Sequence, residues 1–370
     1  MASEPFEPNE WYSLQRTLQT PSHISCLAFG HAGHLFAGSD DGSLRVYDLS
    51  TFKVIKAARG LGAEVSSLVC VKRSGSELRD VWLASGRRVI KLQMDSPKMI
   101  QAVDDALLVV DLTEEGQEDD VLNELALNTN KTHLAFSMDS GVVGVVDLAT
   151  KVVSRMKTKH ESLCDSVKFI PDRPREIVSG GYDTALLHFD FHEGKILSTR
   201  KIPPYAVVGG MALSPPFIMS TAISSTGIIA AGTADGRLLV GCGGHKSPQT
   251  KRSKKKRSRK WEGLDSEEEV IIKIAEGPVV ALAFEDTGML TLSTLLGVMM
   301  RYEVVIDDEE GSVSLVKVWQ QETQSVKKVN ALVVDDKRVI VGGLTAEGNG
   351  VFEIWKKDIN YSLYGLPRRK

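Results

Sequence analysis

The chain of 370 residues carries 45 Lys and Arg against 48 Asp and Glu, which gives a formal net charge of −3 at pH 7. A hydrophobic fraction of 42% with 25% charged residues is typical of a globular protein and excludes a disordered or fibrous chain. No run of about 18 apolar residues could span a bilayer, and the first residues lack the basic and apolar regions of a signal peptide. We therefore expect an intracellular protein with no membrane partner.

The motifs of common catalytic and metal sites are missing from the sequence. It contains no HExxH, no GxSxG and no P-loop, so we expect neither an enzyme nor a cofactor. The four cysteines are Cys26, Cys70, Cys164 and Cys242, which are widely spaced and never form a CxxC pair. Their spacing predicts neither a disulfide framework nor a zinc site, so no metal site is expected.

Residues 11–19 predict a β-strand that precedes the first of several repeated units. The first unit runs from residue 23 to residue 55, with a tight turn at Asp41-Gly42 between its second and third strands. Gly42 supplies the positive φ that such a turn requires.

Three units share one spacing between the tight turn and the aspartate that ends the third strand. The paired positions are Asp41 and Asp48, Ser140 and Asp147, and Asp183 and Asp190, each seven residues apart. Agreement in three places indicates a structural repeat of about 40 residues.

The clearest unit, from His160 to Asp190, contains three residues that can form a hydrogen-bonded chain. His160 precedes the first strand, Ser179 ends the second and Asp183 occupies the turn. Burying an aspartate costs free energy unless the side chain is paired and hydrogen-bonded. We therefore expect the three side chains to bond to one another and to have a structural role. Phe189 stands where a tryptophan would donate a fourth hydrogen bond.

These units resemble the WD-repeat family, whose repeats each form one blade of a β-propeller. The resemblance is carried by LALNTNKTHLAFSMDSGVVGVVDLATKVVSRM and by the following KTKHESLCDSVKFIPDRPREIVSGGYDTALLHF. It implies an all-β fold: a seven-bladed WD40 β-propeller over residues 11–358, closed by the N-terminal strand. We expect the tail, 359–370, to be disordered.

Two stretches depart from the repeat. The second unit, from Glu64, is degenerate and is followed by an acidic stretch over 114–120, interpreted as a solvated loop rather than a site for a cation or a basic partner. The fifth unit has its turn at Asp235-Gly236 and is interrupted by an insert over 242–269, which we expect to be disordered.

The insert contains a strongly basic run. Eight of the ten positions from 251 to 260 are basic, namely Lys251, Arg252, Lys254, Lys255, Lys256, Arg257, Arg259 and Lys260. Such a run is typical of a nuclear import signal read by an import carrier, and a solubilising insert is the bland alternative. Nucleic-acid contact is less favoured, because Trp261 is the only aromatic residue available for stacking. Ser266, followed by three glutamates, is a possible phosphosite that could mask the run.

The family resemblance implies a non-enzymatic scaffold for protein–protein interaction in the nucleus and cytoplasm. It also implies a substrate-receptor-like role on the DDB1 adaptor of cullin-4 ubiquitin ligases. The usual docking signature of such receptors places an arginine two residues after Trp-Asp, where this chain has Ser50, Ala149 and His192. The alternative is a chromatin- or RNA-associated factor that contacts nucleic acid through the basic run.

Overall fold

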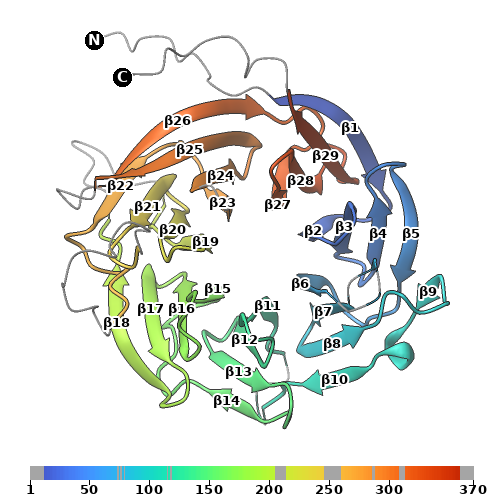
Figure 1. The fold of residues 1–370 in the computed structure, drawn as a ribbon, viewed down its shortest axis with the longest axis horizontal. Coiled ribbons are helices and arrows are strands. Elements are labelled where there is room, and N and C mark those ends of the chain that lie inside the picture. Colours follow the sequence, from blue (N-terminus) through green and yellow to red (C-terminus); the bar gives the residue numbers. More distant parts are fainter. Residues whose placement is uncertain are drawn as a thin grey trace.

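The computed structural model describes residues 12–72, 75, 77–78, 80–114, 116, 119–204, 214–245, 260–285, 288–307 and 313–358. Seven sheets, antiparallel except for one added edge strand, stand in a ring around a central axis, as Figure 1 shows. No α-helix occurs in this part of the chain, which contains 29 strands and the short 3₁₀-helix η1 (Val103–Asp105). The predicted seven-bladed β-propeller is therefore confirmed.

Each blade contains four antiparallel strands with its first strand at the centre of the ring, and the sheet of blade one has a fifth strand at its outer edge. Blades one to three contain β2 (Ile24–Phe29), β3 (His34–Ser39), β4 (Leu44–Asp48) and β5 (Lys53–Ala58); β6 (Val65–Val71), β7 (Asp80–Ser85), β8 (Arg88–Leu92) and β10 (Leu108–Asp111); and β11 (Leu122–Leu127), β12 (His133–Met138), β13 (Val143–Asp147) and β14 (Val153–Arg155). Blades four and five contain β15 (Cys164–Phe169), β16 (Glu176–Gly181), β17 (Ala185–Asp190) and β18 (Lys195–Lys201); and β19 (Ile218–Ile223), β20 (Ile229–Thr233), β21 (Arg237–Gly241) and β22 (Glu269–Lys273). Blades six and seven contain β23 (Val279–Phe284), β24 (Met289–Thr294), β25 (Val298–Ile306) and β26 (Val313–Glu322); and β27 (Lys328–Val334), β28 (Arg338–Leu344), β29 (Gly350–Lys357) and β1 (Tyr12–Thr20).

The N-terminal strand closes the ring, as the sequence predicts. β1 pairs antiparallel with β29 and becomes the outer strand of blade seven. Tyr12 at its start contacts Trp319 of β26 in a tilted arrangement, at 4.9 Å between ring centroids, and accepts a hydrogen bond from Arg301 of β25. Arg301 is buried and also forms an ion pair with Glu285. Its guanidinium group therefore joins blade six to the closing strand.

The core consists of the layers between neighbouring blades. Every residue of β3, β7 and β20 is buried, because a second strand is covered on both sides by the adjacent sheets. Between blades one and two, for example, Phe36 packs with Val65 and Leu83. Such layers make each blade depend on its two neighbours.

Blade two contributes a strand to blade one, which the sequence did not predict. After β8 the chain crosses to the outer edge of blade one, where β9 (Ile100–Gln101) pairs parallel with β5. The Lys56 ammonium group supports the crossing by donating to the carbonyl of Lys98. The chain then returns to form β10 before it enters the acidic stretch.

Loops of two kinds alternate between the two faces of the ring. What we call the first face carries the connections between blades and the loops between second and third strands, as the antiparallel order requires. The second face carries the loops between first and second strands and between third and fourth strands. In the described part of the chain no helix is long and apolar enough to cross a bilayer.

Candidate functional site: the central channel

The inner strands surround a cavity of about 770 Å³ along the axis of the ring. Each of them has a register irregularity at one residue, which bulges from the ladder. The seven bulge residues are Ser25, Ser66, Asn123, Asp165, Met219, Val280 and Asn330, and all of them line the cavity. A bulge re-aims its side chain, so these positions define the channel wall.

Four bulge residues each join their own blade to the next one around the channel, at four of the seven junctions. Their side chains donate to the first carbonyl of the neighbouring inner strand: Ser25 to Val65 (2.8 Å), Ser66 to Leu122 (2.6 Å), Asn123 to Cys164 (3.0 Å) and Asn330 to Ile24 (2.9 Å). Each bond satisfies a carbonyl group that the bulge leaves outside the ladder. A sequence signal was available for three of them, because Ser25, Ser66 and Asn123 each directly follow the first residue of their inner strand, whereas Asn330 is the third residue of β27.

In blade four the same position is occupied by an acid, Asp165. Burial, reinforced by the charge of Glu124, raises its pKa to about 7, while the nearby Lys168 acts in the opposite direction. An ionised carboxylate cannot donate, whereas a protonated one can bond to a carbonyl as Asn123 does. Asp165 therefore makes this part of the wall sensitive to pH.

Replacing Asp165 with Asn is expected to stabilise the protein in a pH-dependent manner. Because its folded-state pKa lies above the unfolded value of about 3.9, wild-type stability falls as pH rises from about 4 to about 7. Asp165→Asn has no carboxyl group to ionise at this position and keeps its stability as pH rises. We therefore expect its free energy of unfolding to exceed that of the wild type by about 2 kcal/mol at pH 8 and by almost nothing at pH 4. Thermal unfolding at the two pH values measures the difference.

The matched control places a carboxylate at the equivalent position of blade three. In Asn123→Asp the hydrogen bond to Cys164 is lost once the new carboxyl group ionises, so stability should decrease with rising pH. An equal gain for Asp165→Asn at both pH values would show that the carboxyl group is ionised throughout.

The mouth of the channel on the first face is acidic near blades one to four. Burial and then the charge of Asp40 raise the pKa of Glu64, and Asp139 lies near Asp165. Within the wall, Glu124 is paired with Lys168, so its charge is compensated. The arrangement favours positively charged groups at this mouth.

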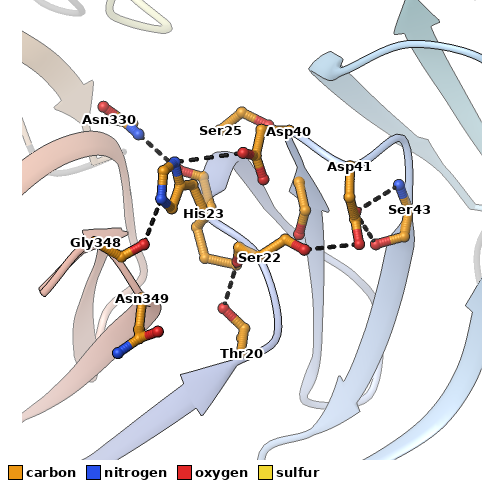
Figure 2. A network of polar contacts seen from close by, with 12 residues as sticks. Thr20, Ser22, His23, Ser25, Asp40, Asp41, Ser43, Asn330, Gly348 and Asn349 are labelled. Carbon is orange, nitrogen blue, oxygen red and sulfur yellow. Dashed lines mark hydrogen bonds and ion pairs between the residues drawn. The ribbon is translucent and has the colours of Figure 1, made fainter.

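A polar network joins blades seven and one at the same mouth (Figure 2). His23 donates from Nε2 to the carbonyl of Gly348 in the β28–β29 loop, and its Nδ1 lies 3.3 Å from Asp40. Ser22 donates to Asp41 at 2.8 Å. The first-face loops at the closing point of the ring are thereby held together.

The predicted chain of His160, Ser179 and Asp183 forms hydrogen bonds inside blade four. His160 Nδ1 lies 2.8 Å from Asp183 Oδ1 and its Nε2 lies 2.8 Å from Ser179 Oγ. Burial alone would raise the pKa of Asp183, but the hydrogen bond from His160 lowers it overall. His160 is only 1% exposed, so the three side chains face the protein interior rather than a ligand.

The predicted turn residues have the geometry expected of tight turns. Gly42 and Gly236 have φ values of 71° and 80°. Asp41 accepts from the backbone N–H of Ser43 at 3.0 Å, and Asp235 pairs with Arg237 at 2.8 Å. In the described ranges no group of three or more His, Cys, Asp or Glu could hold a metal ion, and the four cysteines are free thiols.

Only the last residue of the basic run lies in the described part of the chain. Lys251, Arg252, Lys254, Lys255, Lys256, Arg257 and Arg259 lie outside the described residues, as does the tail, 359–370, while Lys260 is exposed. Ser266 is exposed on the second face, in the connection that leads to β22.

Trp261 corrects one expectation about this run. It is 2% exposed and packs between blades four and five, and its indole N–H donates to the carbonyl of Gly227 at 3.0 Å. It cannot stack on a nucleic-acid base without leaving this site. Ordered structure thus extends into the expected insert, 242–269, at both ends, and 246–259 lie outside the described residues.

The three positions of the docking signature lie on the second face, where third strands end. Backbone N–H groups of Ser50, Ala149 and His192 each bond to the aspartate two residues earlier, at 2.8–2.9 Å. Their side chains are thereby placed next to the turns, but they are not arginines.

Comparison with known proteins agrees with the fold. A family model described as "WD domain, G-beta repeat" matches residues 12–48. The chain is also 21% identical over 236 residues to a protein of Dictyostelium discoideum described as "WD repeat-containing protein 53 homolog". That alignment covers 59% of this chain and 61% of the relative, less than two thirds of its length. The resemblance to the WD-repeat family is confirmed.

Proposed function

We propose that this WD-repeat propeller is a protein–protein interaction scaffold that holds a basic segment of a partner at the first-face mouth of its channel. The observation that carries the proposal is the cavity of about 770 Å³, whose wall is fixed by hydrogen bonds between blades. A rigid site loses little entropy on binding. The acidic groups Asp40, Glu64 and Asp165 at its mouth favour a partner rich in Lys or Arg.

We further propose that the scaffold acts as a substrate-receptor-like adaptor on the DDB1 adaptor of cullin-4 ligases. In this arrangement the second face, with Ser50, Ala149 and His192, docks on DDB1, and the first face remains open to a substrate. The missing arginine at these positions requires that other second-face residues supply the contact. The family resemblance supports this role, and the separation of the two faces is compatible with it.

The test is affinity purification of the tagged full-length chain beside two variants, Asp40→Asn/Glu64→Gln and a deletion of 246–259. We expect DDB1 to be recovered with all three, and partners with basic segments to be depleted at least tenfold only from the double substitution. Recovery of unchanged partners with that variant would refute channel binding. Loss of DDB1 from every preparation would refute the ligase role while leaving the scaffold proposal standing.

The alternative function is a chromatin- or RNA-associated factor that binds phosphates through Lys251–Lys260. The charge density of the run favours it, whereas the burial of Trp261 leaves no described aromatic side chain beside the run for stacking. Binding would then weaken steeply with salt and vanish on deleting 246–259. Salt-tolerant partner binding by the deletion variant would argue against it.

We also propose that the run directs import to the nucleus and that a phosphate on the exposed Ser266 masks it. An unchanged distribution between nucleus and cytoplasm in both Ser266→Ala and Ser266→Glu would contradict the masking.

A further inference from the structure

A second pocket, of about 400 Å³, lies on the second face between blades two and three. Its apolar lining includes Trp82 of β7, Leu107 before β10, Leu127 at the end of β11 and Leu148 after β13. Trp82 is 4% exposed and belongs to the core between the two blades, whereas Leu107 is 54% exposed. A bulky apolar side chain entering the pocket would meet a rigid wall on one side and an exposed leucine on the other.

Three lysines line the same pocket: Lys91, Lys131 and Lys151. The ammonium group of Lys91 lies 5.3 Å from the centroid of the Trp82 ring and 3.9 Å from Asp80. Lys131 and Lys151 are exposed and have no ion-pair partner among the residues that the structure describes. The nearby carboxylate of Asp147 is already bonded to the backbone N–H groups of Ala149 and Thr150. The pocket therefore combines an apolar wall with two lysines that make no ion pair with the described residues.

Two of these lysines occupy turn positions with a positive φ. Lys131 has a φ of 57° and Lys151 a φ of 63°, in the left-handed region that favours glycine or asparagine. A residue with a β-carbon costs about 1 kcal/mol there, so neither turn requires a lysine for its geometry. Both turns place a cation beside the pocket although a more stable turn residue was available. Ala32, Phe52 and Asp172 have a positive φ in the corresponding turns of blades one and four, so the conformation belongs to the repeat. What distinguishes blade three is that both positions carry a lysine.

We propose that this pocket binds an acidic segment of a partner protein that inserts one bulky apolar side chain. The apolar side chain lies against Trp82 and the leucines, and carboxylates on either side of it pair with Lys131 and Lys151. The site is on the opposite face from the channel mouth and prefers the opposite charge. It therefore selects a different partner segment from the one proposed for the channel.

The experiment measures fluorescence anisotropy of labelled synthetic peptides with the full-length protein. One peptide has a central Phe flanked by glutamates, a second has Ala in place of Phe, and a third has lysines in place of the glutamates. We expect the first to bind, the second to bind about tenfold more weakly, and the third not to bind through this pocket. Binding of the first peptide should weaken with added salt, because two of the lysines are exposed.

The informative variant is Lys131→Asn/Lys151→Asn. Asparagine tolerates the left-handed backbone, so the variant should be as stable as the wild type or more stable, and yet bind the glutamate peptide about tenfold more weakly. Lys53→Asn/Lys159→Asn removes the same charge elsewhere and should leave binding unchanged. Equal affinities for the two double variants, or no binding of the glutamate peptide to the wild type, would overturn the proposal.

Discussion

Trp261→Ala should lower the free energy of unfolding by about 3–5 kcal/mol, although the residue directly follows a highly charged run. Its indole packs with Ile218 and Leu264 between blades four and five and makes an edge contact with His188 at 5.0 Å between ring centroids. Truncation would remove this packing, leave a cavity between two blades and deprive the carbonyl of Gly227 of its donor. Urea denaturation of the purified chain measures the loss.

Two further variants separate the parts of this effect. Trp261→Phe keeps most of the packing and loses only the donor, so about 1–2 kcal/mol should be lost. Gly244→Ala should also destabilise, because a β-carbon there would lie 1.9 Å from the indole nitrogen. A stability of Trp261→Ala equal to the wild type would mean that the end of the insert is not docked in solution.

His160→Ala should cost about 2–4 kcal/mol of stability at pH 7. The substitution removes the hydrogen-bond partner of Ser179 and the partner of Asp183, whose side chain is 6% exposed and would keep only backbone donors. A buried carboxylate that loses its partner is costly. His192→Ala, at an exposed position on the second face of the same blade, is the control and should cost less than about 0.5 kcal/mol.

The pH dependence tests the assignment of this cost to Asp183. Its pKa is lowered in the folded state, so its contribution is fully present above the unfolded value of about 3.9 and is lost as pH falls below it. The difference between wild type and His160→Ala should therefore be largest at neutral pH and shrink towards pH 3. A difference that stays constant down to pH 3 would assign the cost to lost packing instead.

The sequence predicted those parts of the fold that depend on local signals. Asp41-Gly42 and Asp235-Gly236 are turn pairs in which the glycine supplies a positive φ. The constant spacing of seven residues, from Asp41 to Asp48 and from Ser140 to Asp147, reflects the constant length of the third strand and its turn. The closing role of residues 11–19 followed from the need to leave no open sheet edge.

Other features depend on contacts that no local pattern specifies. The pairing of β9 with β5 joins segments from different blades through only two residue pairs. The burial of Trp261 requires Gly244 and Gly263, which leave room for the ring. No local pattern in the sequence indicates this fit, because Trp261 directly follows a run of lysines and arginines. The role of Asp165 emerges only when the seven bulge positions are superposed, since on its own it is an ordinary polar residue in a strand.

The pairing of β1 with β29 also constrains how the chain is made. Thr20 pairs with Gly350, 330 residues later, and at the roughly 5–20 residues per second of protein synthesis the ribosome needs tens of seconds to deliver that partner. During this interval β1 has no strand to pair with, and the ring of blades cannot close. A nascent chain that stalls before residue 350 thus carries unpaired strand edges at both ends of an open ring, which makes it a substrate for chaperones and for aggregation.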